Sequence, residues 1–443
     1  MPIRAGRAPG IVSAARLNLF QCAMLRWREL HPYCAAHVIA VRAPFDAARL
    51  RATLAGVLED CGLTGFSLDA ARRRCAFGGG AAQVDLRVLE GGERAALDVA
   101  ADEIAASINR PFPAAGAYDP FRFFAVADGD GFLAGVVYDH IVAGGDSIAV
   151  LMTDVAARYA AQRPQDVALP RLALPRSTCR RLFARYPGAL VRGFAALPGL
   201  LRGWRGVVRP KLADPADGRN GFVHFGVDAG DYARLRAKAK SLGVTTNDVL
   251  LAAVMLAVAP LAGRRDAARR RHAVAVATIV NLRGDFQPPA TQTFGQFLSS
   301  FRVVHDLPEG TPLDALARDL GAQTARARRD RLHFLTLLAM GLAGALWRVA
   351  SLPRRERLYL KYHPVLAGVT PLNVDALRRH GSAAPGDYLR AASTGPMAPL
   401  VVALTTSGGA LRVGITYRTT GISDVQARDV VRGLRRVLAP SPT

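Results

Sequence analysis

The feature that most constrains how this chain folds is an apolar run that ends at a histidine and then turns sharply. Residues Leu133 to Tyr138 are apolar and predict a buried strand. His140 follows almost at once, and the paired glycines Gly144 and Gly145 predict a tight turn. A histidine on such a loop is held rigidly and can face a cavity, and its ordinary pKa of about 6.5 suits proton transfer. The local sequence leaves open whether His140 is an acid–base group or a core histidine whose ring nitrogens bond to the backbone.

A helix is expected directly after this turn. Asp146 or Ser147 is its expected cap, because short polar side chains accept hydrogen bonds from the free N–H groups at a helix start. Before the histidine, FRFFAVADGDGFLAGVVY predicts a hairpin with its turn at Asp128 to Gly131. The apolar residues after the turn recur at helical spacing and share one face: Ile148, Leu151, Met152, Val155 and Tyr159.

Strand and helix patterns are mixed in a comparable way in both halves of the chain, which predicts an α/β protein. With 443 residues the chain is long for one core, so two lobes are expected. The first lobe is predicted over 1–165, a basic linker rich in Pro, Gly and Arg over 166–215, and the second lobe over 216–443. One or two short basic amphipathic helices are expected in the linker, where they would rest on a membrane surface or cover the neighbouring lobe.

Three further patterns stand out in the second half. TTNDVLLAAV predicts a helix capped by Thr245 or Thr246. A closing hairpin is predicted with its turn at Gly408 and Gly409. The run LHFLTLLAMGLAGALWRVASL is nearly long enough to span a membrane, but its histidine, arginine and small residues favour a buried helix.

The net charge is +23, and almost all of the positive charge is arginine. This indicates either selection for an acidic partner or a bias of composition towards arginine and alanine. Nucleic acid is not expected, because the chain has no binding motif for it. The five cysteines have no C-x-x-C spacing and the histidines are scattered, so we expect reduced thiols and no metal site. No apolar block typical of a secretory signal is seen near the N-terminus, so a cytoplasmic protein is expected.

Four motifs occur in an order that is similar to the condensation-domain superfamily, the fold of chloramphenicol acetyltransferase and of CoA-dependent acyltransferases. They are YDHIVAGGDS, TTNDVLLAAV, TIVNLRGDF followed by TFGQFLSSFRV, and ALRVGITY. The chain looks most like wax-ester synthase/diacylglycerol acyltransferases and polyketide-associated acyltransferases. This resemblance implies two chloramphenicol-acetyltransferase-like lobes, each an α+β two-layer sandwich, in a V-shaped pseudo-dimer with a central tunnel.

The motif of that superfamily is His-His-x-x-x-Asp-Gly, with its second histidine at the catalytic centre. On this sequence the second histidine is His140 and the motif glycine is Gly145. Asp139 replaces the first histidine, and Gly144 replaces the aspartate. Asp139 is expected either to orient the imidazole or to raise its pKa and reduce its activity.

In relatives the motif aspartate pairs with an arginine, and the resemblance makes Arg283 in NLRGDF the candidate for that arginine. Two alternatives are open here: Asp146 takes over the ion pair, or the loop has lost it. Loss of one partner of a buried pair leaves the other charge uncompensated, at a cost of about 3–5 kcal/mol. We therefore expect Arg283 to bind either Asp146 or an acidic group of the substrate.

The resemblance implies acyl transfer from a thioester to an alcohol or an amine, in a lipid or secondary-metabolite pathway. The donor would be acyl-CoA or an acidic acyl carrier protein with its phosphopantetheinyl arm, and no permanently bound cofactor is expected. His140 would act as general base, and no covalent acyl-enzyme is expected because both reactants are held together. The alternative is a catalytically silent domain that recruits a carrier protein or a tailoring enzyme.

Four further residues complete the predicted site. Tyr138 and Ser147 are expected to line or brace the pocket. Asn247 matches an Asn-Asp pair of the wax-ester synthase relatives, where it would support the tunnel or belong to a helix cap. Asn373 in VLAGVTPLN stands where relatives have a loop near the acceptor. The basic apolar segments near 180–205 and 333–352 also suggest peripheral contact with the inner membrane face.

Overall fold

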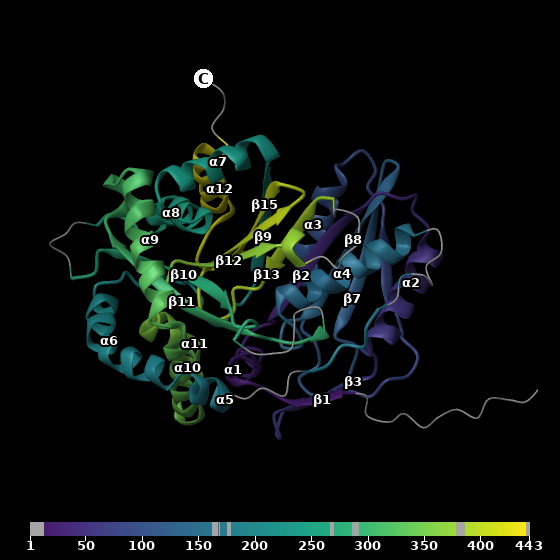
Figure 1. Ribbon diagram of the computed structural model, residues 1–443, viewed down its shortest axis with the longest axis horizontal. Coiled ribbons are helices and arrows are strands. Elements are labelled where there is room, and N and C mark those ends of the chain that lie inside the picture. Colours follow the sequence, from purple (N-terminus) through teal and green to yellow (C-terminus); the bar gives the residue numbers. More distant parts are fainter. Residues whose placement is uncertain are drawn as a thin grey trace, which may run out of the picture.

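Two lobes lie side by side in the computed structural model of the protein, and each contains a sheet covered by helices (Figure 1). The structure describes residues 13–161, 167, 169–174, 179–265, 270–285, 292–377 and 386–439. The two-lobe α/β architecture predicted from the sequence is confirmed.

The first lobe is built on a five-stranded sheet in the order β13 (Tyr388–Ala392), β2 (Cys34–Val41), β8 (Gly131–Asp139), β7 (Phe121–Asp128) and β5 (Leu86–Leu89). Its helices are α2 (Ala47–Cys61), α3 (Ala96–Ser107) and α4 (Gly145–Ala160). Helices cover both faces, because successive strand residues point to opposite sides. Ala35 and Ile39 of β2 share a core with α2 and α4, whereas Ala36 and Val38 share one with α3. The hairpin of β7 and β8 turns between Asp128 and Gly131, as predicted.

The second lobe is built on a six-stranded sheet in the order β11 (Leu298–Asp306), β10 (Ala273–Asn281), β12 (Ala367–Asn373), β14 (Leu400–Ser407), β15 (Ala410–Arg418) and β9 (Asn220–Val227). Helices α7 (Ala229–Ser241), α8 (Thr246–Val258), α9 (Leu313–Arg329) and α12 (Asp424–Leu438) share one core with this sheet. The predicted turn between β14 and β15 is confirmed, and Gly408 and Gly409 have the positive φ angles of 58° and 80° that favour glycine. Short 3₁₀ helices occur at Ala259–Ala262, Pro308–Gly310 and Asp375–Leu377.

One strand from the second half of the chain completes the sheet of the first lobe. β13 pairs antiparallel with β2, and Arg390 lies opposite His37. The chain then enters β14 in the sheet of the second lobe. The two sheets are thereby joined at the lobe interface. The division of the chain at residues 165 and 215 stays a prediction.

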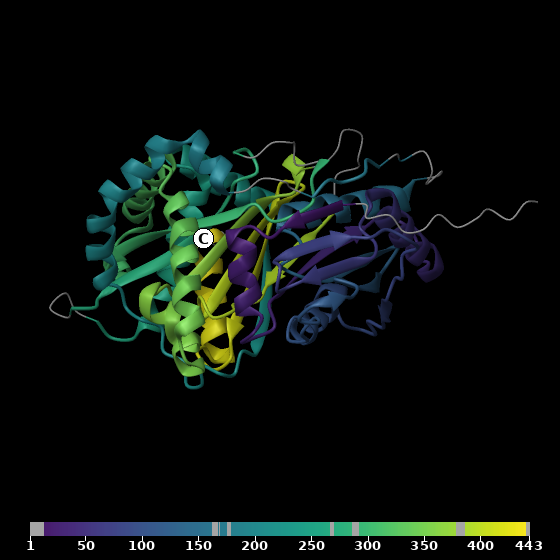
Figure 2. The ribbon, with the colours of Figure 1, turned by 90° about the horizontal axis from the view of Figure 1, so that it is seen from below.

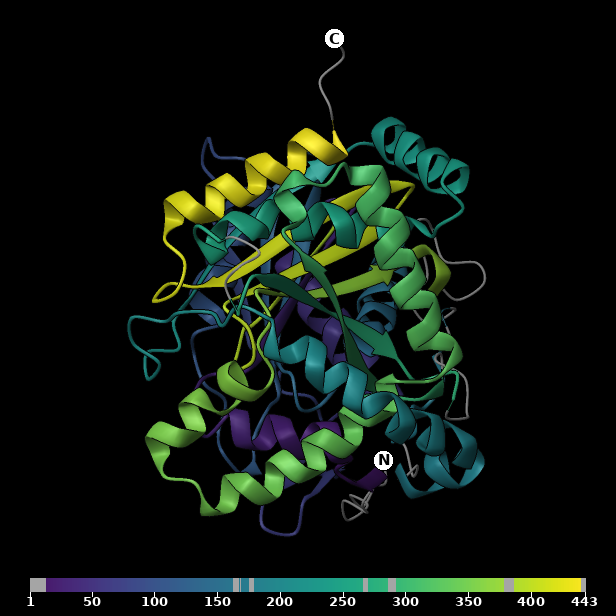
Figure 3. The same ribbon diagram turned by 90° about the vertical axis from the view of Figure 1, so that its left-hand side faces the viewer.

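A small sheet and several helices surround these two units, as Figures 2 and 3 show from two further sides. The small sheet has the order β1 (Ser13–Arg16), β4 (Arg74–Phe77), β3 (Phe66–Asp69) and β6 (Gly116–Ala117). The surrounding helices are α1 (Leu19–Trp27), α5 (Cys179–Arg185), α6 (Pro187–Arg205), α10 (His333–Val349) and α11 (Leu352–Tyr362). Helices α5 and α6 are the basic helices expected in the linker, and α6 packs against α10.

Two local expectations are wrong. Helix α4 has Gly144 as its N-cap without a side-chain hydrogen bond, because Asp146 and Ser147 lie inside the first turn and bind Arg283, and Asp146 accepts only the adjacent N–H of Ser147. Helix α10 is buried on one face only, and Leu342 and Val349 on it are 67% and 81% exposed. No single helix in the described part of the chain is long and apolar enough to cross a membrane. Two helix pairs reach that length only together, and they are bent by 105° and 74°.

Candidate active site

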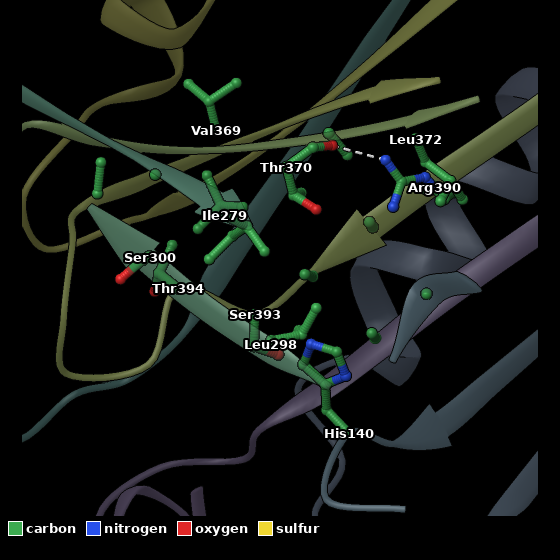
Figure 4. Close-up of a pocket in the computed structure, with 18 of the residues that line it drawn as sticks. His140, Ile279, Leu298, Ser300, Val369, Thr370, Leu372, Arg390, Ser393 and Thr394 are labelled. Atoms are coloured by element: carbon green, nitrogen blue, oxygen red, sulfur yellow. Dashed lines mark hydrogen bonds between the residues drawn. The ribbon is translucent and has the colours of Figure 1, made fainter. Parts of the chain in front are cut away.

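A cavity lies between the two lobes and reaches His140 (Figure 4). Its walls come from β2 and β8 of the first lobe, from β10, β11, β12 and β14 of the second, and from β13, which joins them. Its empty space measures about 1140 Å³, part of it open to solvent. Most of its lining is apolar, but several polar side chains face it: His37, Tyr138, His140, Asp146 and Arg390.

The ring of His140 is oriented by a backbone carbonyl. Its Nδ1 atom lies 3.2 Å from the carbonyl oxygen of Ala143. The side-chain nitrogen of Gln296 also lies 3.2 Å from Nδ1, but its two hydrogens are donated to the carbonyl oxygens of His140 and Ala143. Because the carbonyl oxygen of Ala143 can only accept, Nδ1 donates to it and carries the ring proton, and Nε2 keeps its lone pair. In Figure 4 the ring reaches into the cavity beside Leu298 and Ser393. The lone pair of Nε2 is therefore available to a molecule in the cavity.

Burial keeps this imidazole neutral. His140 is 8% exposed, and burial lowers its pKa to about 4, with the Ala143 carbonyl opposing the shift and Arg390 adding to it. Tyr33 stacks on the ring with 5.5 Å between centroids, and Tyr138 meets it edge-on at 5.6 Å. A neutral imidazole accepts protons, so at neutral pH His140 is in the state that a general base requires.

Gln296 holds the turn that carries the histidine. Its buried side-chain amide donates to the carbonyl oxygens of His140 at 2.5 Å and of Ala143 at 2.7 Å. The backbone N–H of Gly144 in turn donates to the carbonyl of Gly295 at 3.0 Å. A segment of the second lobe thus fixes the loop of the first that carries His140.

Asp146 forms a buried ion pair with Arg283. Nε of Arg283 lies 2.6 Å from Oδ2 of Asp146, and the two side chains are 6% and 3% exposed. Asn281 donates to the same carboxylate oxygen at 2.8 Å, and Nη2 of Arg283 donates to the hydroxyl of Ser147 at 2.6 Å. Of the two alternatives for Arg283, the structure contains the ion pair with Asp146.

Gly144 leaves room for this arrangement. A β-carbon at this position would lie 2.9 Å from Oδ1 of Asp146 and 3.2 Å from Oε1 of Gln296. The side chains of these two residues therefore occupy the space next to Gly144 that a motif aspartate would need. Asp146 forms the ion pair with Arg283 that a carboxylate at residue 144 would otherwise form, and Gln296 fills part of the space beside Gly144.

Asp139 supports the turn rather than the imidazole. Its buried carboxylate pairs with Arg28 at 3.0 Å and accepts a hydrogen bond from the hydroxyl of Tyr118 at 2.6 Å. Its other oxygen accepts from the backbone N–H of Ile141 at 3.3 Å. Burial raises the pKa of Asp139. The pKa of His140 follows from burial, Ala143 and Arg390, so neither effect of Asp139 on the imidazole that we expected is seen.

A second polar cluster lies beside the start of α4. Nδ1 of His37 lies 2.8 Å from the hydroxyl of Tyr388, and burial lowers the pKa of His37 well below its usual value. A β-carbon at Gly145 would lie 3.0 Å from Nη1 of Arg390 and 3.4 Å from Nε2 of His37. The motif glycine therefore allows both side chains to pack against the first turn of the helix.

Two residues predicted for the pocket do not line it. Asn247 lies in the first turn of α8, where Thr245 and Asp248 form the capping box. Asn373 is exposed at the end of β12, and its side chain accepts from the backbone N–H of Ala376 at 3.3 Å. Residues 370 to 372 of the same strand do line the cavity, but Asn373 lies beyond them. Tyr138 lines the cavity, and Ser147 braces the loop through Arg283 and Gly295.

Three residues of the site were not selected from the sequence. His37 lies inside an apolar strand with nothing to distinguish it from a core histidine. Gln296 lies within the quoted segment TFGQFLSSFRV, but its partners are far away in sequence. Arg390 had a signal, because an arginine inside the apolar strand YLRAA is unusual for a buried position.

No protein-family model matches the chain, and a search of the curated proteins gives no match. Solved structures do match over nearly the whole length. The first condensation domain of the calcium-dependent antibiotic synthetase, in complex with a substrate analogue, has a TM-score of 0.67 at 17% identity and covers 98% of both chains. The EpoB cyclization-docking bidomain from Sorangium cellulosum has a TM-score of 0.68 at 16% identity, over 99% of this chain and 88% of the other.

An acetyltransferase and an epimerization domain share this architecture. The trichothecene 15-O-acetyltransferase from Fusarium sporotrichioides has a TM-score of 0.64 at 11% identity, over 96% of this chain and 94% of the other. The epimerization domain from the third module of tyrocidine synthetase B has a TM-score of 0.62 at 14% identity, over 98% and 97%. Identities this low show a shared fold. The chain has the fold of the condensation-domain superfamily, as its sequence motifs indicated.

Proposed function

We propose that this protein transfers an acyl group from a thioester to an alcohol or an amine, with His140 as the general base. The observation that carries this proposal is the neutral imidazole whose Nε2 lone pair faces a cavity between the lobes. Condensation domains and an acetyltransferase with the same fold support it.

The proposed reaction is a direct displacement at the thioester carbonyl. Nε2 of His140 accepts the proton of the acceptor O–H or N–H while the oxygen or nitrogen attacks the carbonyl carbon. The carbonyl of Ala143 accepts the hydrogen bond from Nδ1–H and so stabilises the imidazolium that forms. The C–S bond then breaks, and the departing sulfur takes the proton from Nε2. An ester or amide and a free thiol are the products.

The donor is proposed to be acyl-CoA or an acyl group on a carrier protein. Both donors carry negative charge at the end of the pantetheine arm opposite to the thioester, which suits a chain with a net charge of +23. An epimerization domain with the same fold makes proton abstraction the second candidate reaction. A silent recruiting domain is less favoured, because the ion pair and the oriented histidine of the site are intact.

The test incubates the protein with hexanoyl-CoA and with hexanoyl-N-acetylcysteamine in D₂O, with and without a panel of alcohols and amines. Free thiol and the mass of each product are measured. Thiol release that depends on an acceptor supports acyl transfer. Uptake of deuterium at the carbon next to the carbonyl of an intact thioester would show proton abstraction in place of acyl transfer. Binding of the thioesters without either change would overturn the enzymatic proposal in favour of recruitment.

A further inference from the structure

The ionised groups around the cavity do not balance. Asp146 and Arg283 form an ion pair, and His37 and His140 are neutral. Arg390 remains as an additional cation on β13, and it is 4% exposed. Among the residues that the structure describes, no carboxylate lies within ion-pair distance of its guanidinium. A buried cation without a counterion is unfavourable, so the site lacks one negative charge.

The guanidinium of Arg390 is held in place by neutral acceptors. Nε donates to the hydroxyl of Thr405 at 2.9 Å. Nη2 donates to the carbonyl of Thr370 at 2.6 Å, shown dashed in Figure 4, and to the carbonyl of Leu404 at 3.1 Å. These bonds fix its plane but provide no countercharge. Within the described part of the chain, Nη1 has no hydrogen-bond acceptor.

The free Nη1 group lies where other groups also favour an anion. It lies next to Gly145, at the N-terminus of α4, and both Arg390 and Gly145 line the cavity. Oδ1 of Asp146 accepts from the N–H of Ser147 at 2.8 Å, so the positive partial charge that remains at this helix start comes from the N–H groups of Gly145 and Asp146. The carboxylate of Asp146 in the same turn is bound by Arg283 and Asn281. An anion in the cavity would therefore meet Nη1 of Arg390 without competition from an ion pair.

We infer, on the basis of the proposed function, that one substrate carries a carboxylate that does not react and that Nη1 of Arg390 binds this group. The substrate class is then a hydroxy acid, an amino acid or an acyl group with a distal carboxylate. A carboxylate fits because it brings the single negative charge that the site lacks. A phosphate would bring a second charge for which the described lining offers no cation. The apolar walls, including Ile279 and Val369, accommodate the rest of the molecule.

Octanoate and octan-1-ol are suitable probes because they share an alkyl chain and differ in charge. Their dissociation constants are measured by calorimetry at pH 7 and an ionic strength of about 0.15 M, where surface charges are screened. We expect octanoate to bind at least about 10-fold more tightly than octan-1-ol. In Arg390→Met, octanoate binding is expected to weaken by about 10- to 100-fold, as for loss of a hydrogen bond to a charged group. Binding of octan-1-ol is expected to stay unchanged.

Two controls distinguish binding at Arg390 from binding at the protein surface and from loss of the fold. Arg94→Met removes one exposed arginine, 58% exposed in its side chain, and is expected to leave the octanoate preference intact. Arg390→Gln keeps N–H donors without the charge, so it gives the same test if Arg390→Met does not fold. Equal affinity for the two probes in the unaltered protein, or a preference that survives both Arg390 variants, would overturn the inference.

The outcome is independent of the proposed acyl transfer, because binding of octanoate needs no turnover. His140→Ala is expected to keep the preference for octanoate while losing activity. If the preference is absent but thiol release still depends on an acceptor, the carboxylate inference alone is wrong. If the preference is present and no thioester reacts, the carboxylate site stands and the reaction must be revised.

Discussion

The Nε atom of Arg283 lies 2.6 Å from Oδ2 of Asp146, and this buried ion pair links the two lobes beside the loop that carries His140. Asp146 belongs to the first turn of α4, and Arg283 follows β10 of the second lobe. Ser147 and Asn281 extend the same network. The position of His140 relative to the cavity therefore depends on contacts that both lobes provide.

Replacement of Asp146 by asparagine is expected to lower the free energy of unfolding by about 3–5 kcal/mol, because Arg283 then stays buried without a counterion. Urea denaturation measures this change. Asp102→Asn is the control, because it removes an exposed ion pair with Arg94 that is expected to contribute at most about 1 kcal/mol. Similar losses in the two variants would contradict a stabilising role of the buried pair.

Restoration of the motif aspartate in Gly144→Asp is expected to reduce both stability and activity. The added side chain would meet Oδ1 of Asp146 and Oε1 of Gln296, and it would place a second carboxylate beside the first. The midpoint of thermal unfolding and the rate of acceptor-dependent thiol release measure the effect. A gain in activity would mean that glycine at this position is a defect of the loop and not a compensated change.

The strand, turn and helix around His140 were predictable from sequence because each depends on residues that are neighbours in the chain. The apolar run forms β8, the two glycines form the turn, and the amphipathic pattern forms α4. The hairpin turns at Asp128 to Gly131 and at Gly408 were predictable for the same reason.

The partners of these elements were not predictable, because they come from distant parts of the chain. Gln296 binds the backbone of a turn more than a hundred residues earlier, and no local pattern marks it. Arg390 enters the site only because β13 leaves the second lobe and pairs with β2. Asn373 was placed in the pocket from the resemblance to relatives that have a loop near the acceptor, but β12 carries it beyond the cavity.

Removal of the imidazole in His140→Ala is expected to lower kcat by about two to four orders of magnitude, the usual contribution of a general base. The fold is expected to remain, because Gln296 holds the loop through backbone carbonyls and not through the ring, although Tyr33 and Tyr138 each lose a ring contact. Steady-state thiol release measures kcat, and circular dichroism checks that the fold remains. His333→Gln changes another buried histidine that does not line the cavity, and it is expected to keep its activity. Full activity of His140→Ala would exclude the general-base role.

Exposed apolar residues on α6 and α10 predict binding to anionic membranes. Phe194 on α6 is 58% exposed, and Leu342 on α10 is 67% exposed. Arginines at 192, 202 and 205 of α6 would add attraction to anionic lipid. We expect the protein to sediment with phosphatidylglycerol vesicles. Phe194→Glu is expected to weaken this binding, and Val425→Glu on α12 is the control that is expected to leave it unchanged. Equal sedimentation of the protein with anionic and with neutral vesicles would argue against binding of anionic lipid by this surface.

Acid is expected to destabilise the fold between about pH 6.5 and pH 4. An unfolded chain protonates its histidines near pH 6.5, whereas burial lowers the pKa values of His31, His140 and His333 to about 4. Burial also raises the pKa of Asp119, to about 6, and that of Asp139, and these two carboxyls oppose the effect of the three rings. The rings outnumber them, so the unfolded state binds more protons and the free energy of unfolding falls as the pH falls. Urea titrations at several pH values measure the slope. A stability that is constant between pH 7 and pH 5 would contradict burial of these rings.

The pH profile of kcat/KM is expected to differ from that of an ordinary histidine enzyme. Protonation of Nε2 removes the base, and the pKa of about 4 places this loss well below the usual 6.5. The value of kcat/KM is therefore expected to stay constant from pH 8 to about pH 5 and to fall at lower pH. The folded fraction is measured separately in the lower range, so that loss of the fold is not mistaken for protonation of His140. Initial rates with saturating acceptor measure the profile. A falling limb near pH 6.5 would contradict a buried, neutral ring in the working enzyme and would mean that water or a negative charge stabilises the imidazolium of His140.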